Sequence, residues 1–239
     1  LGSSMSMAEI LAVLYGDVMH YDPKNPLSPD RDRLVLSKGH AAVALYAALH
    51  EAGFLTKDDI DHAMHGESPY YEHPQMDPSR GIEFSSGSLG QGISLAVGTA
   101  LGLKKKGLSA KAYVILGDGE CDEGQVWEAA PSIAKFGLTN LTVIVDDNRL
   151  QFDGPKDEVM RIADPVGRWA CLGLDVVTVD GHDVEALREA FLRETEKPKV
   201  IIAKTVKGKG VHFAENEVTW HTGRLTDELY QEAVRDIND

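Results

Sequence analysis

Positive charge, cysteine and long apolar runs are all scarce in this sequence. Lys and Arg number 24 against 38 Asp and Glu, so the 239 residues carry a formal charge of −14. This excess of negative charge argues against broad binding to nucleic acid or anionic membranes, although a phosphorylated ligand can still bind locally. Two cysteines cannot form a disulfide framework, which indicates a reducing, cytoplasmic compartment. No stretch approaches the ~18 consecutive apolar residues of a membrane span.

The sequence has the composition of a folded globular protein, with 43% hydrophobic and 26% charged residues. Its length fits one large α/β domain. Because it contains neither an internal repeat nor a recognisable linker, we expect a single domain over residues 1–239.

Apolar runs alternate with helical patterns in the second half of the chain. The continuous apolar run at 112–116 predicts a buried parallel strand, and the largely apolar segments 141–145, 175–179 and 200–205 predict three more. The segments between them include predicted helices at 123–136 and 184–194. This alternation is typical of βαβ units, so we predict an α/β fold with a mostly parallel sheet covered by helices on both faces.

The first half of the chain contains four further predicted helices, one of them starting after Thr56. Residues 6–9 have the spacing of a capping box, and apolar residues recur at helical spacing as far as about Met19. Ala-rich residues 41–52 and the small, apolar residues 91–106 predict two more helices, separated by a long loop at 65–90. A loop of that length in a compact domain is usually functional or disordered.

Two of the predicted strand ends are polar and acidic. Asp118 follows one strand and Asn148 the next, and the 30 residues between them correspond to one helix plus one strand. Adjacent parallel strands can therefore place both side chains at one sheet edge, where such folds bind ligands. Carboxylate, amide and backbone carbonyl oxygens suit Mg²⁺ or Ca²⁺, and Gly119 permits close approach of a phosphate. We predict a metal-bridged diphosphate site; the alternative is that both side chains make only turn and cap hydrogen bonds.

Gly-Asp-Gly followed about thirty residues later by Asn is also the thiamine diphosphate motif, and the whole chain resembles the N-terminal, diphosphate-binding domain of the transketolase family. Matching segments are spread along most of the chain. They are Ser37-Lys38-Gly39-His40, His73-Pro74, residues 87–92, residues 117–124, Asp146-Asp147-Asn148, residues 207–210 and Trp220-His221. Together these segments are highly specific, although no single one of them is.

The resemblance implies a role for each matching residue. The metal ligands would be Asp118, Asn148 and the backbone carbonyl of Leu150. The residues implied to bind thiamine diphosphate are His40, Ser88, Leu89, Gly117, Asp118, Gly119, Glu120, Asn148 and His221. His40, His73 and His221 are implied to be catalytic, and Glu123 matches a glutamate in a carboxylate network between subunits.

Histidine suits the chemistry that the resemblance implies. Ketol transfer deprotonates a sugar hydroxyl, breaks a carbon–carbon bond and later reprotonates, and a group with a pKa near ~6.5 can do both proton transfers. Each of the three histidines also has a structural alternative: His40 as a helix cap, His73 as a loop residue before Pro74, and His221 as a residue packing on Trp220.

Several other reactive side chains are predicted to be structural. His20, His50, His62 and His65 lie in or beside helices, where a surface or packing role is expected. Cys121 is expected to be a small buried thiol rather than a nucleophile. Lys204, Lys207 and Lys209 predict either a mobile basic loop over an anionic cofactor or a solvated turn.

The length of the chain then implies a split enzyme. In the family, the glutamate that activates the cofactor and the residues that hold the sugar phosphate lie in domains beyond this one, and one histidine lies just upstream of the match to Leu1. We therefore expect the N-terminal subunit of a transketolase of pentose phosphate type. It would transfer a two-carbon ketol unit from a ketose or its phosphate to an aldose, with thiamine diphosphate and Mg²⁺ or Ca²⁺. A C-terminal, pyrimidine-binding subunit would complete a heterotetramer of two copies of each chain.

Three other functions compete with this one. The alpha subunit of a thiamine-dependent 2-oxoacid dehydrogenase would share Gly-Asp-Gly and Asn148, but not the other motifs together. A synthase that condenses pyruvate with an aldehyde phosphate is the second. The third is a non-catalytic cofactor-binding subunit, which has no need of Asp118, Asn148 and all three histidines.

Overall fold

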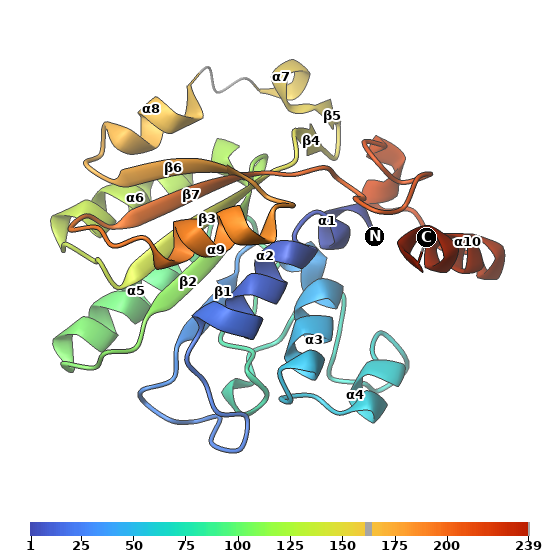
Figure 1. Ribbon diagram of the computed structural model, residues 1–239, viewed down its shortest axis with the longest axis horizontal. Helices are drawn as coiled ribbons and strands as arrows, with labels where there is room; N and C mark the ends of the chain where they lie inside the picture. The colour runs from blue at the N-terminus through green and yellow to red at the C-terminus, as the bar shows by residue number, and fades with distance from the viewer. Residues whose placement is uncertain (161–163, 239) are drawn as a thin grey trace.

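A parallel sheet of five strands runs through the middle of the molecule in the order β1-β2-β3-β7-β6 (Figure 1). The computed structural model describes residues 1–160 and 164–238. The strands are β1 (Arg33–Leu36), β2 (Ala112–Gly117), β3 (Leu141–Asp147), β6 (Asp175–Asp180) and β7 (Lys199–Lys204). Every neighbouring pair in this sheet is parallel, which confirms the predicted fold class.

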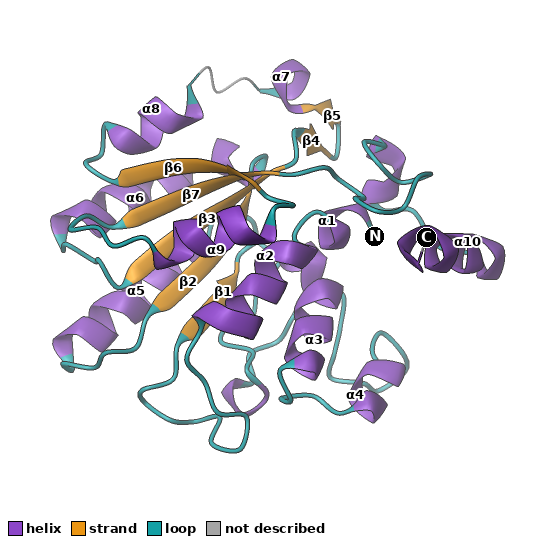
Figure 2. Ribbon diagram, viewed as in Figure 1, coloured by secondary structure: helices purple, strands orange, loops and turns teal. Residues whose placement is uncertain are grey.

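Helices cover both faces of the sheet (Figure 2). One face packs against α2 (Ala8–Val13), α3 (Ala42–Glu51) and α9 (Val184–Leu192), and the other against α5 (Gly92–Lys105), α6 (Gly124–Lys135) and α8 (Pro165–Ala170). Successive strand residues alternate between the two hydrophobic clusters, as side chains of a pleated strand must. Leu34 and Leu36 belong to the first cluster, for example, and Val35 to the second.

Short elements fill the connections. They are α1 (Gly2–Met5), η1 (Leu14–Val18), η2 (Gly39–Ala41), α4 (Lys57–Asp61), η3 (Pro78–Arg80), η4 (Glu120–Asp122), β4 (Leu150–Gln151), β5 (Gly154–Pro155), α7 (Lys156–Val159) and η5 (Val218–His221). The last helix, α10 (Asp227–Asn238), extends away from the sheet in Figure 1 and buries Ala233 against Val211 and Ala214.

The predicted capping box at residues 6–9 is wrong. Helix α2 begins at Ala8 without a side-chain cap. The Ser6 hydroxyl instead lies 2.6 Å from Oδ2 of Asp146, and the Glu9 carboxylate pairs with His182 at 3.0 Å. Long-range partners have therefore taken both side chains that the local motif would use.

Among the described residues, no helix combines the length and the apolar character that crossing a lipid bilayer requires.

Candidate active site

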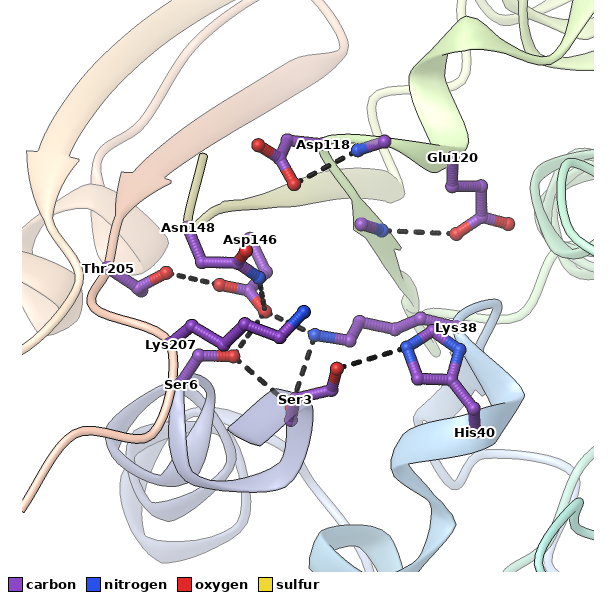
Figure 3. A network of polar contacts seen from close by, with 12 residues as sticks. Ser3, Ser6, Lys38, His40, Asp118, Glu120, Asp146, Asn148, Thr205 and Lys207 are labelled. Carbon is purple, nitrogen blue, oxygen red and sulfur yellow. Dashed lines mark hydrogen bonds and ion pairs between the residues drawn. The ribbon is translucent and has the colours of Figure 1, made fainter. Parts of the chain in front are cut away.

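Four of the predicted site residues, His40, Asp118, Glu120 and Asn148, lie together at the carboxyl ends of the strands (Figure 3). His40 follows β1, Asp118 follows β2, and Asn148 follows β3. Lys207 reaches the same place from the segment after β7, and α1 lies against them. The chain thus brings polar groups from four strand ends to one edge of the sheet, which is where open parallel sheets bind ligands.

The three predicted metal ligands are held by one tight turn. The backbone N–H of Arg149 donates to Oδ2 of Asp118 at 2.8 Å, and the N–H of Leu150 donates to Oδ1 of Asn148 at 3.1 Å. Arg149 itself has φ 64°, a left-handed conformation that is uncommon for a non-glycine residue. A strained residue of this kind is often found at functional sites. The turn places a carboxylate, an amide and a backbone carbonyl close together.

The chemistry of this donor set fits a hard divalent cation. In the described part of the chain, no group of three or more His, Cys, Asp or Glu side chains could hold a metal ion. The oxygens of Asp118, Asn148 and Leu150 are instead the mixed set that Mg²⁺ or Ca²⁺ accepts, completed by ligand phosphates and water. Nζ of Lys207 donates to the Leu150 carbonyl at 3.2 Å, so one cationic group already lies beside this oxygen.

Asp118 is buried among two further acids and a lysine. Burial raises the pKa of Asp118, and the neighbouring carboxylates of Asp146 and Asp147 raise it further, while Lys156 opposes them. Nζ of Lys156 lies 3.5 Å from Asp118 and 3.1 Å from Asp147. Asp118 is therefore a buried carboxylate that already has one cationic partner, and burial is the main cause of its raised pKa.

His40 and His221 form a stacked pair at the mouth of this region. Their ring centroids lie 5.0 Å apart with planes inclined by 28°. Burial, followed by the nearby cations Lys38 and Lys207 and by His221, lowers the pKa of His40 to about 3. Burial and the same lysines lower the pKa of His221 to about 4. Both rings are therefore neutral at neutral pH, where each has one acceptor nitrogen and one N–H donor.

Lys207 is buried, which makes the predicted solvated turn wrong at this position. Its side chain is only 1% exposed, and Nζ donates to Nδ1 of His221 at 2.7 Å. Burial lowers the pKa of Lys207 to about 8, and Lys38 adds to this effect. Lys204 is exposed and Lys209 half-buried, so only one of the three lysines points into the site.

His73 lies on the exposed rim rather than in the buried pair. It packs over Gly87, where a Cβ atom would lie 3.1 Å from the imidazole ring. Ser88 and Leu89 follow Gly87 on the same exposed loop. The structure thus places His73, Ser88 and Leu89 together, next to the site and open to solvent.

Gly119, Glu120 and Glu123 follow β2, and they differ in burial and in the groups that they contact. A Cβ on Gly119 would lie 2.8 Å from the Gln151 side chain, so the backbone closely approaches a protein group here. Glu120 is buried, and its oxygens accept hydrogen bonds from Gly90 N at 2.7 Å and Gly117 N at 3.1 Å, as well as from the Ser37 hydroxyl. Glu120 therefore ties three loops together through its carboxylate. Glu123 is exposed.

Sequence reasoning assigned no role to the group at the centre of Figure 3, which is Asp146. This carboxylate is fully buried and forms an ion pair with Lys38. Burial alone would raise the pKa of Asp146, but Lys38 and the hydroxyls of Ser6 and Thr205 hold it below its usual range. The sequence offers one indication of this role, because Asp146 is a charged residue directly after the predicted buried strand at 141–145.

The remaining reactive side chains are structural, as predicted. Cys121 is buried, and burial raises the pKa of its thiol. His20, His62 and His65 are exposed, and the ring of His50 bonds to the Leu55 carbonyl at 3.0 Å.

Known proteins resemble this chain over almost its whole length. Residues 1–236 match the protein family described as the transketolase, thiamine diphosphate binding domain. The chain is 40% identical to a 6-deoxy-6-sulfo-D-fructose transketolase subunit of a Clostridium species, covering 99% of the chain and 87% of that relative. It is 38% identical to one of the subunits of an apulose-4-phosphate transketolase of Phocaeicola vulgatus, covering 100% of the chain and 86% of that relative.

Solved structures agree on the fold. The transketolase of Campylobacter jejuni superposes on 99% of the chain with a TM-score of 0.92 and 31% sequence identity. The chain spans only 39% of that longer protein.

Proposed function

Because the chain belongs to the transketolase family, as its thiamine diphosphate binding domain, we propose that it is the N-terminal subunit of a two-chain transketolase. The complex would transfer a two-carbon ketol unit from a ketose or its phosphate to an aldose. The two relatives are named for different sugars, so ketol transfer, rather than any one substrate, extends to this chain. Relatives named as transketolase subunits do not favour the 2-oxoacid dehydrogenase alternative.

The observation that carries this proposal is the turn that brings Asp118, Asn148 and Leu150 together beside two neutral imidazoles. The three oxygens would hold Mg²⁺, with Ca²⁺ as the alternative, and the metal would bridge to the diphosphate of the cofactor. Gly117, Gly119 and Glu120 form the turn around this site. Lys207 and Lys38 add positive charge that offsets the phosphate charges.

The bound cofactor supplies the electron sink for carbon–carbon bond cleavage. The residues of this chain then have to position the cofactor and the sugar and to transfer protons. We assign proton transfer with the sugar hydroxyls to His40, and to His221 an Nε2–H that donates a hydrogen bond, because Nδ1 of His221 accepts from Lys207. His73, at the exposed rim, is placed to contact the substrate end nearest to solvent.

We also propose that a second subunit completes the site. The relatives are named as subunits, which supports a partner chain. We assign to it the pyrimidine-binding half of the site and an α2β2 assembly, with the exposed Glu123 at the interface between chains. The two free cysteines support a reducing, cytoplasmic location.

The test is ketol transfer by the purified complex with thiamine diphosphate and Mg²⁺. The complex should transfer the ketol unit, and Asp118→Ala should abolish transfer. Asp175→Ala removes a carboxylate at the opposite end of the sheet and should leave transfer intact. Pyruvate decarboxylation without ketol transfer, or full activity of Asp118→Ala, would overturn the proposal.

A further inference from the structure

The side chain of Asp146 lies behind the proposed metal site and joins four segments of the chain (Figure 3). Its Oδ2 accepts from Ser6 Oγ at 2.6 Å and from Asn148 Nδ2 at 3.3 Å, and it pairs with Lys38. Its Oδ1 accepts from the Thr205 hydroxyl. The carboxylate is 0% exposed, so its oxygens depend on protein groups for their hydrogen bonds.

The contact with Asn148 determines which end of that amide faces the site. An ionised carboxylate can only accept hydrogen bonds, so it selects the NH₂ end of a neighbouring amide. Nδ2 of Asn148 therefore points to Asp146, and Oδ1 points the other way, where it accepts from Leu150 N at 3.1 Å. Rotating the amide by half a turn would place two oxygens together and two N–H groups together.

A cation requires the oxygen of that amide, because the NH₂ group has no lone pair to offer. We propose that Asp146 is a positioning residue that orients Asn148, so that Oδ1 is presented to the divalent cation. This inference rests on the proposed function, since it needs a metal at Asp118, Asn148 and Leu150. Residues behind metal ligands commonly change metal affinity by about 10- to 100-fold when replaced.

The measurement is the Mg²⁺ concentration at which half of the two-chain complex binds thiamine diphosphate, followed by tryptophan fluorescence or calorimetry. Asp146→Asn should raise that concentration by about 10-fold or more. Asp32→Asn is the matched control, because Asp32 is also buried, and its carboxylate accepts from His20 N and Lys111 N at the opposite edge of the sheet. It should leave the Mg²⁺ requirement within about twofold of wild type.

Two double variants separate orientation from simple neutralisation of Lys38. In D146N/N148D the charge moves to position 148, where a carboxylate offers an oxygen in either orientation. In K38M/D146N the buried pair is replaced by neutral groups, which proteins often tolerate. The proposal predicts that D146N/N148D recovers most of the Mg²⁺ affinity and that K38M/D146N does not. If D146N does not fold because Lys38 is left unpaired, the Mg²⁺ requirements of the two double variants can still be compared with that of the wild type.

Opposite results overturn the inference. An unchanged Mg²⁺ requirement in Asp146→Asn would overturn it. Recovery of Mg²⁺ affinity in K38M/D146N, without recovery of Mg²⁺ affinity in D146N/N148D, would also overturn it. If the wild-type complex itself binds no thiamine diphosphate with Mg²⁺, the proposed function fails instead, so the two failures are distinguishable.

Discussion

The rings of His40 and His221 stack with their centroids 5.0 Å apart, although one ring follows β1 and the other ends η5 near the C-terminus. Nε2 of His40 lies 3.2 Å from Ser3 Oγ, and Nδ1 of His221 lies 2.7 Å from Nζ of Lys207. Each ring therefore has a fixed polar partner and a hydrophobic face covered by the other ring. Two neutral rings held in this way present hydrogen-bonding groups in fixed positions to a ligand.

The stability of the chain should fall as the pH drops below about 6.5. The pKa of His40 is lowered to about 3 and that of His221 to about 4, whereas both would titrate near ~6.5 in the unfolded chain. Between these values only the unfolded state binds the protons, so acid favours unfolding. The loss should reach about 1.4 kcal/mol per pH unit for His40, and less for the less deeply buried His221. Urea unfolding between pH 7 and 4.5 measures it.

The control is the double variant His40→Gln with His221→Gln. The variant keeps all the carboxylates, so their titration affects the stability of the variant and of the wild type equally. The variant should lose less stability than wild type over the same pH interval. Equal slopes would show that the two imidazoles are not the groups responsible.

Removing the charge of Lys207 should raise the pKa of His221. Lys207 is, after burial, the largest cause of the lowered pKa of His221, and its Nζ lies 2.7 Å from the ring. In Lys207→Met, the pKa of His221 should move from about 4 towards the ordinary value near ~6.5. NMR titration of the ring protons measures this shift. Lys204→Met, at an exposed lysine nearby, should leave the titration unchanged.

The strands of this fold could be predicted because buried parallel strands are continuous apolar runs. β2, β3, β6 and β7 each begin or end within two residues of the predicted positions. The predicted end of β3 stopped at the last apolar residue. In the structure β3 continues through Asp146 and Asp147, because their backbones pair with Ala203 and Lys204 of β7. Backbone pairing does not depend on side-chain polarity, so the pattern could not show this.

Only part of the candidate site could be predicted, because some of its contacts join residues that are remote in the sequence. Asp118 and Asn148 are recognisable because their spacing matches a βαβ unit and both follow strands. The role of Asp146 depends on Lys38, Ser6 and Thr205, which are remote in the sequence. Lys207 was predicted to lie either in a mobile basic loop over the cofactor or in a solvated turn, yet the fold buries its side chain. Such contacts come from the tertiary arrangement, and no local pattern contains them.

Glu120→Gln should destabilise the folded chain. The Glu120 carboxylate accepts from Gly90 N, Gly117 N and the Ser37 hydroxyl, and an amide would direct its NH₂ group at one of these donors. A buried donor left unsatisfied costs about 1–3 kcal/mol, and urea unfolding at pH 7 should show a loss of that size. Glu123→Gln, three residues further on and exposed, should unfold within about 0.5 kcal/mol of wild type. Equal stabilities for the two variants would contradict the role of Glu120 as the tie between three loops.

Thiamine diphosphate together with Mg²⁺ should raise the melting temperature of the two-chain complex. A ligand that binds only the folded state stabilises it by about 2.7 kcal/mol at a hundred times its dissociation constant. Removing the metal with a chelator should reverse the increase, because the donor oxygens of Asp118, Asn148 and Leu150 do not hold the diphosphate directly. Asp118→Asn keeps the shape of the side chain but removes its charge, so its melting temperature should respond little to the added ligands. A full increase in this variant would mean that the cation binds elsewhere, whereas a full increase after chelation would mean that the diphosphate binds without a metal.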